Sequence, residues 1–80
     1  MTMAPSTLSS LGVGRKARIL EVGGDAALQQ RLLEFGLLPG VEVRLVRQAP
    51  LGDPIEIEVL GYSLSLRRSE AAHVHVEALP

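Results

Sequence analysis

The residues best suited to chemistry in this 80-residue chain are two histidines near its C-terminal end. His73 and His75 are separated by one residue, so on a strand they would lie on the same side, with Glu77 next to them. Imidazole and carboxylate groups in this arrangement are ligands for a transition metal, but the pattern supplies no further ligand. Because exposed strand histidines are more often solvent-facing, we predict neither a metal site nor a cofactor.

Enzymatic chemistry is disfavoured by what the sequence lacks. It contains no cysteine, which excludes a thiolate metal site, a disulfide framework and a cysteine nucleophile. Gly-x-Ser-x-Gly, His-Glu-x-x-His and Walker-type phosphate loops are also missing. A chain this short leaves little room for a deep cleft. We therefore predict that the protein is not an enzyme and does not bind GTP by itself.

Arginine is the other residue type with a plausible chemical role. Arg67 and Arg68 could contact an acidic partner surface, or a nucleotide phosphate, because a guanidinium stabilises charge in phosphoryl transfer. We expect them instead to lie in solvent at a strand end, and Arg31 to meet Glu34 or solvent on its helix. The formal net charge of -1 gives no electrostatic basis for binding nucleic acid or acidic lipid.

These residues must be positioned by short strands and one helix. Leu28, Leu32 and Phe35 recur at helical spacing and predict a helix over Ala26–Phe35, with Asp25 capping its start and Gly36 its end. An apolar-rich segment bounded by glycine turns predicts the first strand, Ala17–Val22. Alternation of apolar and polar residues predicts four more, which are Val41–Leu45, Ile55–Val59, Leu64–Leu66 and Val74–Val76.

The order of these elements predicts a mainly β fold. We expect a small SH3-like β-barrel of about five strands, with one α-helix inserted after the first strand, a turn at Gly61-Tyr62 and one helical turn over Arg68–Ala72. Residues 1–7 are expected to be a disordered lead-in and residues 8–80 one domain. No run of about 18 apolar residues occurs, so we predict no direct membrane insertion. The absence of cysteine is consistent with a reducing compartment, and we expect the protein to be cytoplasmic.

Two loops place leucines beside proline and glycine, where loops are usually polar. Their side chains either dock a partner or fold back to cap the barrel, and Tyr62 has the same two alternatives. Asp53 is expected to hydrogen-bond within its own turn. The candidate partner-binding residues are Leu37, Leu38, Pro39, Gly40, Leu51, Gly52, Asp53, Tyr62 and Arg67.

The segment Arg31–Gly40 resembles the signature of the FeoA family, a leucine-rich helix followed by glycine, two apolar residues and Pro-Gly. Later motifs follow in the order and at the spacing of that family, and the resemblance runs from about Leu8 to Val76. These motifs are Pro50–Pro54, Gly61-Tyr62, Leu64–Arg68 and Glu70-Ala71. Two departures are conservative: Ser65 stands where many relatives carry Ala, and Phe35 occupies a position that is often aliphatic.

The resemblance implies a cytosolic accessory protein of bacterial ferrous iron uptake. It would dock on the cytosolic part of FeoB, a membrane permease with a G-protein-like domain, and weak self-association is compatible with this role. One alternative is an SH3-like regulatory domain related to metal-dependent repressors, which would follow a DNA-binding region, and we expect this chain to begin too close to the barrel for that. Another is an RNA-associated SH3-like barrel, which needs a basic stripe and aromatic platforms, whereas aromatic residues make up 2%.

Overall fold

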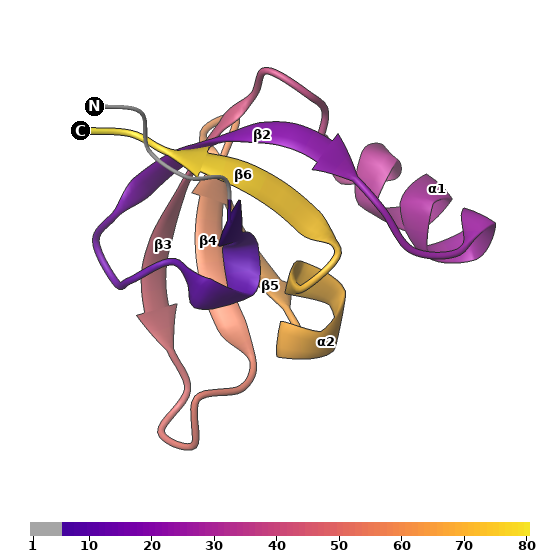
Figure 1. The fold of residues 1–80 in the computed structure, drawn as a ribbon. Helices are drawn as coiled ribbons and strands as arrows, with labels where there is room; N and C mark the ends of the chain where they lie inside the picture. Colours follow the sequence, from indigo (N-terminus) through magenta and orange to yellow (C-terminus); the bar gives the residue numbers. More distant parts are fainter. Residues whose placement is uncertain (1–5) are drawn as a thin grey trace.

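The structure is a computed structural model that describes residues 6–80 and is mainly β, with one long helix after the first long strand (Figure 1). Its elements are β1 (Ser6–Thr7), the 3-10 turn η1 (Leu8–Ser10), β2 (Lys16–Val22), α1 (Ala26–Glu34), β3 (Glu42–Gln48), β4 (Ile55–Val59), β5 (Tyr62–Leu66), α2 (Arg68–Ala71) and β6 (Val74–Ala78). Each predicted strand and helix is present, with boundaries shifted by a few residues. None of the helices among residues 6–80 is both long and apolar enough to cross a bilayer.

All strands described belong to one antiparallel sheet in the order β1-β6-β2-β3-β4-β5. The sheet therefore has six strands among residues 6–80, where about five were predicted. Within residues 6–80, strand pairing leaves β1 and β5 as edges, so the ladders do not close the predicted barrel. The elements that follow these two edges, η1 and α2, pack against each other, and Leu8 of η1 and Ala71 of α2 are fully buried.

The N-terminal edge differs from the sequence prediction. Ser6 and Thr7, assigned there to a disordered lead-in, pair with Val76 and His75 of β6. Leu8 follows and is fully buried. A two-residue strand is too short to show alternation, so no periodic pattern predicted it. Residues 1–5, the rest of the predicted lead-in, lie outside the described residues.

The core is built by the alternation seen in the sequence. In β4, Ile55, Ile57 and Val59 are buried while Glu58 between them is exposed. Aliphatic side chains from every long element complete this core. The largest fully buried ones are Leu8, Ile19, Leu32, Leu37, Leu45, Ile55, Ile57 and Leu66.

Helix α1 begins and ends as its sequence predicts. The Asp25 side chain accepts a hydrogen bond of 2.8 Å from the backbone N–H of Leu28, which satisfies a free donor of the first turn. The helix stops before Gly36, whose φ of +92° is a conformation that glycine adopts without steric cost. Leu32 is fully buried, and Leu28 and Phe35 pack partly buried against the core.

The turn between β4 and β5 lies one residue earlier than predicted. It consists of Leu60 and Gly61, with φ of 52° and 84°, and Tyr62 is already the first residue of β5. Two positive φ angles in a two-residue hairpin loop identify a type I′ turn, which matches the twist of the flanking strands. Leucine is an unusual residue at such a position.

Candidate docking surface

The two leucine-containing loops lie at opposite ends of β3 (Figure 1). One loop leads from α1 into β3 and the other leads from β3 into β4. Seven residues of extended chain separate them by about 20 Å. The predicted partner-binding residues therefore do not form one site, because their positions in sequence put a whole strand between them.

The first loop divides into a buried and an exposed part. Leu37 is fully buried, and its N–H donates to the carbonyl of Leu32 at 3.1 Å, so it caps the core as one alternative anticipated. Leu38, Pro39 and Gly40 are exposed. The N–H of Gly40 donates to Ile19 at 2.7 Å, which fixes the loop against β2. Only Leu38 therefore offers a large apolar side chain from this loop.

Four apolar or aromatic residues lie in the segments next to Gly36, and we call Leu33, Leu38, Leu60 and Tyr62 the Gly36 patch. All four side chains are exposed. The backbone of Gly36 bonds with Leu33 and Leu38, at 2.9 and 3.0 Å. The Tyr62 hydroxyl donates to the carbonyl of Phe35, so the ring is held at the end of α1. Tyr62 thus joins the first loop, not the second.

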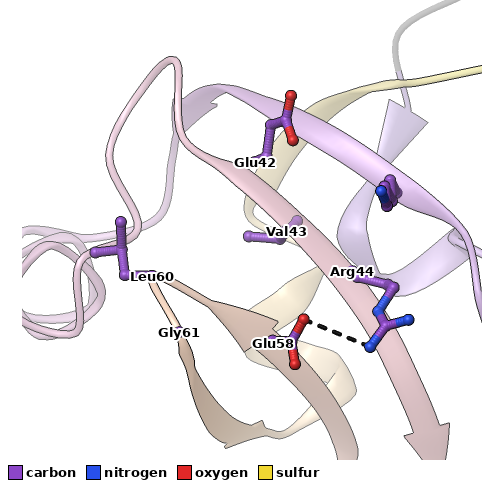
Figure 2. Close-up of a pocket in the computed structure, with 7 residues that line it drawn as sticks. Glu42, Val43, Arg44, Glu58, Leu60 and Gly61 are labelled. Atoms are coloured by element: carbon purple, nitrogen blue, oxygen red, sulfur yellow. Dashed lines mark hydrogen bonds and ion pairs between the residues drawn. The ribbon is translucent and has the colours of Figure 1, made fainter.

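Leu60 is the member of the patch that the sequence prediction missed. Its side chain is 66% exposed and extends from the hairpin tip toward the loop after α1 (Figure 2). A Cβ built on Gly36 would lie only 2.7 Å from Cδ1 of Leu60, so the leucine packs closely over the glycine. No sequence signal marked Leu60, because leucine seldom takes the positive φ that this turn requires.

The second loop is held by hydrogen bonds to α2. Asp53 does not bond within its own turn as predicted, but accepts a 3.0 Å hydrogen bond from the backbone N–H of Arg68. Arg68 Nε donates to the Gly52 carbonyl at 2.6 Å, and its guanidinium also bonds the Ser9 carbonyl. Arg68 is therefore not a solvated strand end, and Gly52 and Asp53 hold α2. Leu51 is 97% exposed at the tip.

The remaining arginines have different environments. Arg67 is exposed and lines a shallow depression with Asp53 and Pro54. Arg31 does not pair with Glu34, as its helical spacing suggested, but with Glu70 of α2 at 2.7 Å. Tertiary packing overrides the local spacing here.

The histidines do not share a strand face. His73 lies in the turn before β6, where its carbonyl accepts the Gly23 N–H at 2.7 Å, and only His75 and Glu77 are within the strand. Among residues 6–80, no group of three or more His, Cys, Asp or Glu side chains is arranged to hold a metal. The structure therefore brings together no metal-binding set from the predicted residues.

The outer face of β2, β3 and β4 is charged. A shallow pocket of 330 Å³ beside Leu60 and Gly61 is lined by Lys16, Glu42, Arg44 and Glu58, as Figure 2 shows in part. Ion pairs cross this face between neighbouring strands. They are Arg18–Glu42 at 3.8 Å, Arg44–Glu58 at 3.4 Å and Arg47–Glu56 at 3.0 Å. The Gly36 patch therefore has a polar border on its sheet side.

The sequence matches the model of the FeoA domain over residues 6–78. It is 39% identical, over 72 residues, to the Fe(2+) transport protein A/Fe(2+) transporter FeoB fusion protein of Porphyromonas gingivalis. The match covers 90% of this chain but only 8% of that protein's length.

Solved structures of similar proteins share the fold. The FeoA-like protein of Clostridium acetobutylicum is 32% identical with a TM-score of 0.89, covering 100% of this chain and 92% of that one. The zinc complex of Stenotrophomonas maltophilia FeoA, described as a procaryotic SH3 domain protein, is 36% identical with a TM-score of 0.78, covering 89% and 88%. The crystal structure of T. acidophilum IdeR is 21% identical with a TM-score of 0.83, covering 99% of this chain and 36% of that one, which shows a shared fold alone.

Proposed function

The chain belongs to the FeoA family, and from this premise we propose that it is a cytosolic accessory protein of ferrous iron uptake that docks on the cytosolic part of a FeoB-type permease. Docking, not catalysis, is the proposed mode of action. The protein would change the activity of the permease by binding to a surface on it.

One observation carries the proposal. In the P. gingivalis relative, a region 39% identical to this chain is part of the same polypeptide as a FeoB transporter. Joining two domains in one chain raises their effective concentration for each other to about the millimolar range. A FeoA domain that acts on such a permease, whether joined to it or not, needs a surface that contacts it.

The Gly36 patch is suited to such docking. Its four side chains are apolar or aromatic, and they lie on the end of a helix, the loop that follows this helix, a two-residue turn and the start of a strand. Exposed apolar groups on rigid elements lose little conformational freedom when a partner covers them. The charged pocket of Lys16, Arg44 and Glu58 borders the patch and would supply the polar rim usual at protein interfaces.

The contacts of Arg31 and Arg68 argue against their direct participation in nucleotide hydrolysis and favour docking. An arginine that acts in phosphoryl transfer must extend freely from a rigid loop into the nucleotide site. The side chain of Arg31 is engaged by Glu70, and that of Arg68 by the carbonyls of Gly52 and Ser9. Releasing either one would break contacts that hold α2.

The proposal is tested by titrating the purified chain into the soluble cytosolic part of the permease from the same organism in a calorimeter. We expect saturable binding with one chain per permease subunit. The absence of binding at concentrations up to the millimolar range would contradict the proposed function.

A further inference from the structure

Strand β5 is an open and unprotected edge of the sheet. It pairs with β4 over five residues without a register shift, and with no other strand among residues 6–80. Proteins usually protect such edges with charged residues, proline, a bulge or shortness. β5 reads Tyr-Ser-Leu-Ser-Leu and has none of these, whereas the opposite edge, β1, is only two residues long.

The outer face of the neighbouring strand β4 carries charged residues, whereas that of β5 carries serines. Ser63 and Ser65 lie opposite Glu58 and Glu56 of β4 in the register, so their small side chains share the outer face with these carboxylates. Both glutamates are paired with arginines of β3. Charged side chains thus line the outer face of β2, β3 and β4 but not that of the edge strand β5.

The hairpin turn determines which backbone groups point outward. In a two-residue type I′ hairpin, the residues flanking the turn form a hydrogen-bonded pair, here Val59 and Tyr62. Alternation then directs the N–H and C=O groups of Ser63 and Ser65 away from β4. Among residues 6–80, no backbone hydrogen bond outside the ladders uses these four groups.

These free groups have the spacing of an added strand. The N–H and C=O groups of Ser63 lie about 7 Å along the edge from those of Ser65. An extended chain presents its own hydrogen-bonding groups at this spacing, whereas a helix does not. The edge also runs directly into the Gly36 patch, because Tyr62 belongs to both. We propose that β5 binds an extended segment of the permease's cytosolic part by strand addition at Ser63 and Ser65, with an apolar residue of that segment lying on the Gly36 patch. This inference rests on the proposed function.

The patch argues for such a segment over a second copy of this chain. Two copies of β5 could pair antiparallel with the two Leu64 residues opposite each other. In that register, Arg67 and Arg68 of the second copy would lie opposite Gly61 and Leu60. Cations would then face apolar side chains. Arg68 also begins α2 and is held by Gly52 and Asp53, so the copy's chain could not continue extended there.

Amide hydrogen exchange of the intact protein tests the inference without a substitution. In the free chain, the Ser63 and Ser65 amides should exchange rapidly and the Leu64 amide slowly. Saturation with the permease's cytosolic part should slow the two serine amides at least about tenfold. Binding that leaves their exchange unchanged would overturn the inference while the proposed function stands, and no binding at all would overturn both. Protection that depends on the concentration of this chain alone would assign the edge to a second copy, contrary to the inference.

Substitutions provide a second test of the same edge. Proline is tolerated on an edge strand where its missing N–H faces solvent. Ser63→Pro and Ser65→Pro should weaken permease binding at least about tenfold with the circular dichroism spectrum preserved. Ser63→Ala and Ser65→Ala keep the N–H and should bind within about twofold of the wild type. Equal affinity of folded proline and alanine variants would contradict strand addition.

Discussion

The guanidinium of Arg31 lies 2.7 Å from the carboxylate of Glu70, and this ion pair joins α1 to α2. The second carboxylate oxygen of Glu70 accepts the N–H of Arg67 at 3.0 Å, so one side chain serves both the helix pair and the start of α2. The Glu70 side chain is 11% exposed and that of Arg31 59%. The pair is therefore buried on one side only.

This asymmetry predicts unequal losses of stability. Glu70→Ala removes both contacts and leaves the Arg67 N–H without its acceptor, so we expect the free energy of unfolding to fall by about 1–3 kcal/mol. Arg31→Ala removes a largely exposed partner and should cost less, about 1 kcal/mol or below. Urea unfolding measures both, with Glu34→Ala, on the exposed face of α1, as the control. A larger loss for Arg31→Ala than for Glu70→Ala would contradict this description.

The packing of α1 predicts opposite effects at adjacent positions. Leu32 is fully buried and Leu33 is exposed. Leu32→Asp should unfold the domain, because an unpaired buried charge costs several kcal/mol and a chain of this size has little stability to spare. Leu33→Asp should remain folded. Well-dispersed amide NMR spectra of both variants would show that α1 does not pack as described.

The contact between Gly36 and Leu60 predicts a non-additive pair of substitutions. Gly36 and Gly40 have nearly the same φ, +92° and +90°, but a Cβ meets Leu60 at Gly36 and nothing within 4 Å at Gly40. Gly40→Ala should cost about 1–2 kcal/mol for backbone strain alone, and Gly36→Ala more. Adding Leu60→Ala should recover part of the loss at Gly36 and none at Gly40, as thermal denaturation would show. Equal losses at both glycines would argue against this contact.

Local patterns in the sequence predicted the elements, because each depends on residues close in the chain. Alternation identified β4 through Ile55, Ile57 and Val59, and Asp25 and Gly36 marked the ends of α1. The short β1 was not predicted, because two residues are too few to show a period. The turn at Leu60-Gly61 was displaced because leucine seldom takes a positive φ.

The candidate site could be predicted only in part, because its members meet through tertiary packing. Leu38 and Tyr62 were identified, but the sequence could not show that they lie beside Gly36 together with Leu60. Arg31 and Asp53 found partners in α2 in place of the local ones that spacing suggested. Long-range contacts of this kind leave no periodic signal.

The account also predicts a weak effect on nucleotide turnover. Single-turnover GTP hydrolysis by the permease's cytosolic part should change little when this protein is added at saturation, and the Arg67→Ala variant should behave like the wild type. An inserted arginine typically accelerates hydrolysis about 10³- to 10⁵-fold. A thousandfold acceleration that Arg31→Ala, Arg67→Ala or Arg68→Ala abolishes would show that the protein acts through such an arginine.

The central claim is docking through the Gly36 patch, and the most direct measurement compares the affinity of three leucine variants for the permease's cytosolic part. Leu38→Glu and Leu60→Glu place a carboxylate in the patch, and Leu51→Glu places the same group on a more exposed leucine about 20 Å away along β3. With melting temperatures near that of the wild type, the two patch variants should bind at least about tenfold more weakly and Leu51→Glu normally. Normal binding by both folded patch variants, or loss of binding only in Leu51→Glu, would contradict the account.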